Sequence, residues 1–85
     1  MSYRFAARWK EELTITAPGG VLVIEMTMGV AHIYFPDEAA WQSHAPAWAL
    51  GERDAILRSL RAWAAAQKIP VTVAPAWVHE DDRAR

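Results

Sequence analysis

One stretch of the sequence, from Phe35 to Ala74, constrains the fold more than any other. An apolar segment ends at Phe35-Pro36, and a second one, Pro70–Ala74, begins with proline. Between them, apolar residues recur every three or four positions from Gly51 to Lys68, a spacing that places them on one face of an α-helix. Because proline cannot continue a helix, Pro70 separates this helix from the segment that follows. The order predicts a helix that connects two strands of one sheet.

The residues before this stretch carry the alternating pattern of strands with one buried face. Three such segments are Leu13–Ala17, Val21–Met28 and Val30–Phe35, separated by glycine-containing turns. Residues Tyr3 to Trp9 favour a further edge strand, with a single amphipathic turn as the alternative. Short connections favour pairing between neighbours in sequence. The sequence therefore predicts an α+β fold: a small antiparallel meander of three to four strands packed by one main helix, with a final strand after the helix.

The size and composition of the chain predict one domain with an aromatic core. It has 85 residues, five tryptophans and no cysteine. A chain this short buries only roughly 60–65% of its unfolded surface, and no disulfide or thiolate metal site can stabilise it. We predict a single α+β domain over residues 1–78 and a polar, flexible tail over residues 79–85. The predicted core is Leu13, Ile15, Leu22, Ile24, Met26, Ile33, Phe35, Trp41, Trp48, Ile56, Leu60, Trp63, Ile69, Val71 and Val73.

The charge and hydropathy of the chain indicate a cytoplasmic protein. A net charge of −1 gives no overall attraction to nucleic acid or to an anionic membrane. No segment approaches the roughly 18–20 consecutive apolar residues of a transmembrane helix. The start of the sequence, Met1 to Phe5, lacks the long apolar run of a signal peptide. We therefore expect no membrane partner.

Part of the sequence resembles a pattern in small uncharacterised bacterial proteins. The matching residues are Trp41, the loop Pro46-Ala47-Trp48-Ala49 and the segment Arg53–Leu60. In those proteins a Trp…Pro-x-Trp-Ala loop leads into an Arg-x-x-Ile-x-x-x-Leu helix, and some are grouped with the immunity proteins of bacterial polymorphic toxin systems. The resemblance covers about a third of the chain, and Glu52 stands where the pattern has a second arginine. It implies a cytoplasmic protein that binds another protein and has no enzymatic activity.

The histidines do not form a recognisable metal-binding pattern. His32, His44 and His79 are far apart in the sequence, and none belongs to an HxxxH or HExxH motif. The segment His79-Glu80-Asp81-Asp82 could bind a divalent ion weakly, although its charge also fits a solvated acidic tail. We predict no metal ligand and no cofactor.

The sequence also lacks a clear catalytic motif. Ser43-His44 is the one adjacent Ser/His pair, and no strand–turn–helix nucleophile elbow surrounds it. Assembly of this pair with Asp37 or Glu38 in space stays open as a route to a hydrolase. We predict that the protein is not an enzyme and has no catalytic residue.

Partner binding is the function that the sequence favours most. Five tryptophans exceed what one small core can hide, and tryptophan is a preferred interface anchor. We predict partner-binding residues at the start of the helix and along its polar face: Trp48, Arg53, Arg58 and Arg61. The partner is predicted to be another protein, and pairing of sheet edges leaves a homodimer open. The alternative is a small nucleic-acid-associated regulator that uses the same basic helix face.

Overall fold

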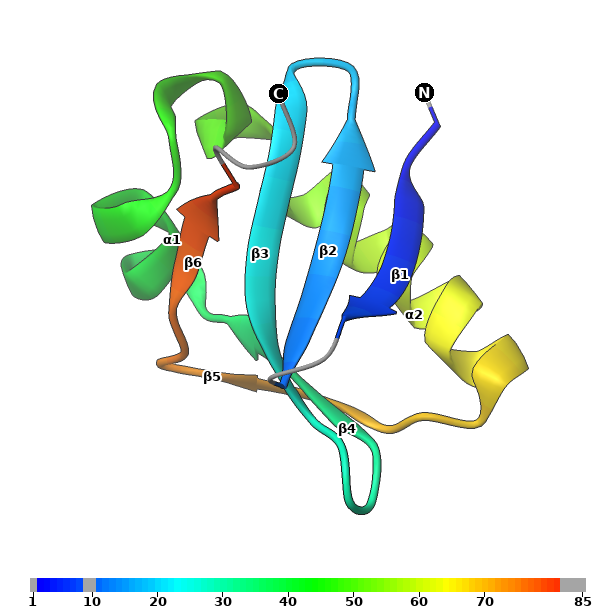
Figure 1. Cartoon of the computed structure of the whole chain (residues 1–85). Helices are drawn as coiled ribbons and strands as arrows, with labels where there is room; N and C mark the ends of the chain where they lie inside the picture. Colours follow the sequence, from blue (N-terminus) through cyan, green and yellow to red (C-terminus); the bar gives the residue numbers. More distant parts are fainter. Residues whose placement is uncertain (1, 9–10, 82–85) are drawn as a thin grey trace.

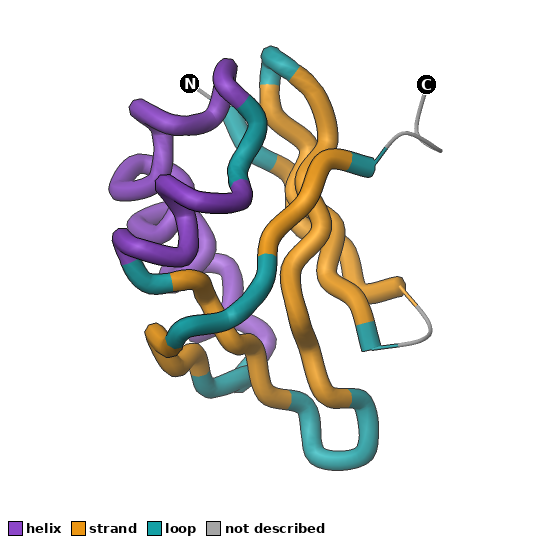
Figure 2. The backbone as a smooth tube through the Cα atoms, turned by 90° about the vertical axis from the view of Figure 1, so that its left-hand side faces the viewer, coloured by secondary structure: helices purple, strands orange, loops and turns teal. Residues whose placement is uncertain are grey.

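The computed structural model describes residues 2–8 and 11–81. In this part of the chain a mixed sheet of six strands has its helices on one side (Figures 1 and 2). The strands are β1 (Arg4–Arg8), β2 (Glu12–Ala17), β3 (Gly20–Thr27), β4 (His32–Pro36), β5 (Val71–Ala74) and β6 (Val78–Glu80). The helices are α1 (Glu38–His44), the 3₁₀-helix η1 (Ala47–Glu52) and α2 (Arg53–Gln67). The α+β fold predicted from the sequence is confirmed.

The first four strands form the predicted antiparallel meander. β1 pairs with β2, β2 with β3, and β3 with β4, all antiparallel. β5 follows α2 in the chain and pairs with β4 in parallel, so α2 is the connection between two parallel strands. The edge strand expected within Tyr3–Trp9 is β1, and Trp9 itself lies outside the described residues.

The main helix, α2, turns an apolar face toward the sheet. Ile56, Leu60 and Ala64 are buried in the core on that face, while Arg58 and Arg61 are exposed. The helix begins at Arg53, two residues later than predicted, because η1 occupies the residues before it. No helix among residues 2–8 and 11–81 has the length and apolarity that a membrane crossing requires.

The core follows the predicted list with a few corrections. Buried as predicted are Leu13, Ile15, Leu22, Ile24, Met26, Ile33, Phe35, Trp41, Ile56 and Leu60. Trp48, Trp63, Ile69 and Val71 are partly buried against this core, and Trp63 packs on Phe5 with 5.8 Å between ring centroids. The prediction for Val73 is wrong: the residue is 37% exposed because β5 is an edge strand.

The strand β3 changes partner along its length. Its residues Leu22–Ile24 pair with β6, whereas Glu25–Thr27 pair with β4. Since β2 pairs with the other side of β3, β4 and β6 share one side and separate between Ile24 and Glu25. We call this point the fork; β6 and β4 lie above and below it in Figure 1.

The predicted start of a flexible tail at residue 79 is wrong for residues 79–81. His79 and Glu80 belong to β6, and Asp81 is only 4% exposed. The backbone N–H of Asp81 also donates to the carbonyl of Val21, at 2.8 Å. The polar composition of this segment concealed a strand, because its backbone hydrogen bonds and the charge of Asp81 are satisfied by distant residues. Residues 82–85 lie outside the described part of the chain.

Candidate functional site

An open cleft of about 460 Å³ lies at the fork. Its walls are α1, the middle of β3 and the segment that connects β5 to β6. We call it the fork cleft. The residues that line it are Glu25, Asp37, Ala39, Ala40, Ser43, His44, Pro75, Ala76 and Trp77.

The helix α1 forms one wall of the cleft and is held firmly in the fold. Asp37 caps its first turn, since one carboxylate oxygen accepts a hydrogen bond from the N–H of Ala40 at 2.9 Å. On the opposite face of α1, Trp41 is fully buried and stacks on Phe35, with 5.4 Å between ring centroids. The indole N–H of Trp41 donates to the carbonyl of Ala49 at 3.0 Å. The wall is therefore built on a core tryptophan.

Glu25 contributes a carboxylate from the centre of the sheet. Its neighbours in β3, Ile24 and Met26, point into the core, so alternation places Glu25 on the opposite face. The register puts it across from Glu12 on β2 and from Tyr34 on β4. Within residues 2–8 and 11–81, no side chain forms a hydrogen bond or an ion pair with its carboxylate.

Trp77 stands beside Glu25 at the fork. The last pair between β3 and β6 is Ile24 with Val78. Glu25 follows Ile24 and Trp77 precedes Val78, so these two residues flank the last pair. The Trp77 side chain is 38% exposed, and the imidazole of His79 stacks on its indole at 5.2 Å between centroids. A partly exposed aromatic side chain and a carboxylate thus line the same cleft.

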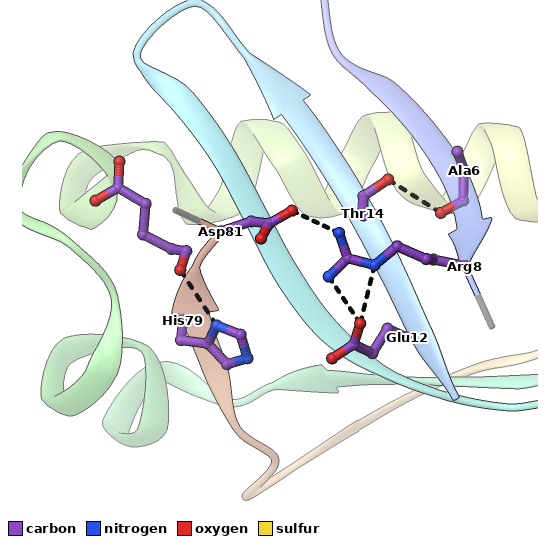
Figure 3. Close-up of polar contacts among 7 residues, drawn as sticks. Ala6, Arg8, Glu12, Thr14, His79 and Asp81 are labelled. Carbon is purple, nitrogen blue, oxygen red and sulfur yellow. Dashed lines mark hydrogen bonds and ion pairs between the residues drawn. The ribbon is translucent and has the colours of Figure 1, made fainter. Parts of the chain in front are cut away.

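A cluster of three charged side chains lies on the sheet (Figure 3). The guanidinium of Arg8 donates to Glu12 through two nitrogens, at 2.9 and 2.7 Å, and to a carboxylate oxygen of Asp81 through the third. The hydrogen bond to Asp81, and to a lesser extent those to Glu12, raise the pKa of the Arg8 guanidinium, so it stays charged. We call these residues the Arg8 cluster. It gives Glu12 a counter-charge that Glu25 lacks among the described residues.

The structure brings together the residues of the catalytic alternative but does not connect them. Asp37, Ser43 and His44 all line the fork cleft. Among the described residues, no hydrogen bond joins any two of these three side chains, and Asp37 already caps α1. In the same part of the chain, no group of three or more His, Asp or Glu side chains is placed to hold a metal ion.

Two of the predicted partner-binding residues make contacts within the fold. Trp48 is half-buried over the turn at Gly19 and Gly20, and its indole N–H donates to Glu80 at 3.2 Å. Arg53 donates to the carbonyl of Pro36 at 3.1 Å, and its guanidinium lies over the ring of Phe35, 5.4 Å from the centroid. These contacts fix the loop and the start of α2.

The other two predicted residues, Arg58 and Arg61, are exposed on α2. No hydrogen bond or ion pair links either of them to another described residue. None of the four predicted residues lines the fork cleft. Sequence reasoning missed Glu25 and Trp77, although a lone carboxylate inside the apolar segment Val21–Met28 was a signal that could have identified the first.

Comparisons with models of protein families, with curated proteins and with solved structures find no match to this chain.

Proposed function

We propose that this protein is a non-enzymatic domain that binds another protein. The observation that supports this proposal is Trp77, which is 38% exposed and stands at an open cleft. Trp41, Trp48 and Trp63 are used by the fold, through a buried hydrogen bond, a turn contact and packing on Phe5. Tryptophan beside a concave surface is the residue type that most often anchors a protein interface.

The exposed face of α2 offers a second region for protein contact, separate from the cleft. Arg58 and Arg61 extend into solvent there, and arginine is the other residue type enriched among interface anchors. The same two residues with Lys68 support the alternative function, a nucleic-acid-associated regulator, because basic side chains on one helix can contact phosphates.

Affinity purification from a cell lysate tests the proposal. We expect the wild-type chain to retain a partner protein that a Trp77→Ala variant loses, because truncation removes the anchor. Val30→Ala is the matched control, since Val30 is 87% exposed and lies in the turn between β3 and β4, outside the cleft. Equal recovery of every protein by the wild type, by Trp77→Ala and by Arg58→Glu/Arg61→Glu would contradict the proposal.

A salt titration of the recovered complex separates the two functions. Affinity for nucleic acid falls steeply with salt, because phosphate contacts release counterions. A protein interface anchored by tryptophan depends much less on salt. If the partner belongs to a toxin, as the resemblance to immunity proteins implies, co-expression of this chain should restore growth of cells that express the partner.

A further inference from the structure

We infer that the fork cleft binds the guanidinium group of an arginine side chain on the partner protein. The inference rests on the proposed function and adds the chemistry that the partner must present. Three observations support it. They are the negative charge of the cleft lining, the different surroundings of Glu12 and Glu25, and the presence of Trp77 in the same lining as Glu25.

The lining of the cleft selects for positive charge. Glu25 and Asp37 contribute two carboxylates, and no lysine or arginine of residues 2–8 and 11–81 lines the cleft. His44 is the remaining titratable group in the lining, and it is exposed. Asp37 uses one carboxylate oxygen to cap α1, whereas the described residues offer no partner to the carboxylate of Glu25. A cation that enters the cleft therefore meets an acid that no described residue compensates.

The register of the sheet gives a second reason to expect a bound cation at Glu25. Glu12 and Glu25 are directly opposite each other on β2 and β3, and like charges in that position destabilise a sheet. Arg8 compensates Glu12 through two hydrogen bonds. No described residue does the same for Glu25, so a cation bound there would relieve the repulsion between the two glutamates. Relief of this repulsion therefore adds to the free energy of binding that the direct contact provides.

Arginine fits this cleft better than the other cationic side chain. Its planar guanidinium can stack on an indole and form two parallel hydrogen bonds to one carboxylate, whereas the lysine ammonium is a compact point charge. Trp77 and Glu25 flank the same pair of the sheet, and both residues line the cleft. The open cleft of about 460 Å³ admits a long side chain that extends from a partner surface.

A titration followed by NMR tests the inference on the full chain. The probes are three capped pentapeptides, Gly-Gly-X-Gly-Gly, in which X is arginine, lysine or citrulline, the neutral isostere of arginine. We expect saturable shifts of the Trp77 indole N–H with the arginine peptide and weaker binding of the lysine peptide. Binding of the citrulline peptide should be about tenfold weaker or absent, because charged hydrogen bonds are lost.

Two protein variants locate the contact. Glu25→Gln should weaken binding of the arginine peptide about tenfold. The matched control Glu11→Gln removes the same charge from an exposed glutamate outside the cleft and should leave the affinity unchanged. Unfolding curves of both variants should stay close to the wild type, which excludes misfolding as the cause.

Several results would overturn the inference. Equal binding of the arginine and citrulline peptides, or no saturable shift with any peptide, would show that the cleft does not recognise a guanidinium. Methylguanidinium that binds as tightly as the arginine peptide would indicate a small-molecule site instead of a docking site. A partner that is lost with Trp77→Ala but retained by Glu25→Gln would refute this inference alone, while a partner retained by Trp77→Ala would refute the proposed function.

Discussion

Two glutamates that face each other across the sheet, Glu12 and Glu25, have opposite surroundings. Glu12 belongs to the Arg8 cluster, in which Arg8 also contacts Asp81, a residue that is 4% exposed. Glu25 lines the fork cleft, where no described residue compensates its charge. The Arg8 cluster joins β1, β2 and the end of β6, so its charges hold strands together. In the function proposed above, the charge in the fork cleft is instead compensated by a partner.

The comparison separates residues that maintain the fold from residues that are open to function. Burial and hydrogen bonds within the chain mark the first group, which includes Trp41, Trp48 and Arg53. Exposure beside a concave surface marks the second, which includes Trp77. Substitutions in the two groups should therefore differ in their effect on stability.

The largest effect is expected from the tryptophan behind the cleft wall. Trp41→Ala should lower the free energy of unfolding by about 3–5 kcal/mol, because it removes a fully buried ring and a hydrogen bond. Trp77→Ala should cost less, about 1–2 kcal/mol, since that ring is 38% exposed and stacks on His79. Urea unfolding followed by far-UV circular dichroism measures both. Similar costs for the two tryptophans would show that Trp77 is also structural.

The next effect concerns the Arg8 cluster. Asp81→Ala should destabilise the protein by about 1.5–3 kcal/mol, because Arg8 then loses a partly buried, charged hydrogen bond. Asp54→Ala is the control, because it breaks an ion pair between Asp54 and Arg53. The Asp54 side chain is 78% exposed, so this change should cost less than about 1 kcal/mol. Thermal or urea unfolding compares them. An Asp81→Ala variant as stable as the wild type would show that residues 79–81 do not stabilise the fold and behave as a flexible tail.

A smaller effect tests whether Trp48 is fixed by the fold. A Cβ atom at Gly19 would lie 2.6 Å from the Trp48 ring, which cannot move freely because it is hydrogen-bonded to Glu80. Gly19→Ala should therefore cost about 1–2 kcal/mol by overpacking. Gly29→Ala, which meets no atom within 4 Å, should change the stability by less than about 0.5 kcal/mol. Indistinguishable unfolding midpoints would mean that Trp48 can leave the turn and reach a partner.

The sequence predicted those parts of the fold that depend on local patterns. Alternation identified β2 and β3, and the helical spacing identified the buried residues Ile56 and Leu60 of α2. Asp37 belongs to a residue type that often caps helices, and it does cap α1. In each case, residues within one element determine both the conformation and the face that is buried.

The fork and its cleft could not be predicted in this way. They depend on β6, a strand of three polar and apolar residues that pairs with β3 more than fifty positions earlier in the chain. A strand so short has no recognisable periodicity, and the segment also carries the charges of a solvated tail. Trp48 and Arg53 were assigned to a partner because sequence does not reveal which side chains are occupied by contacts such as those with Glu80 and Pro36.

The smallest effect is expected from removing the charge of Glu25, which faces Glu12 across the sheet. Glu25→Gln should raise the free energy of unfolding by about 0.3–0.5 kcal/mol, because it removes the repulsion with Glu12. The gain should shrink at about 1 M salt, where charges are screened within roughly 3 Å. Glu12→Gln should instead destabilise the protein, since Arg8 loses an ionised partner.

A double-mutant cycle at low salt decides whether the two glutamates interact. If they do, the gain from Glu25→Gln should disappear in a Glu12→Gln background, because the opposing charge is already gone. An equal gain in both backgrounds would place the repulsion elsewhere, at Asp37 for example. A loss of stability with Glu25→Gln would mean that the fold itself uses this carboxylate, and the difference between the Arg8 cluster and the fork cleft would no longer separate structure from function.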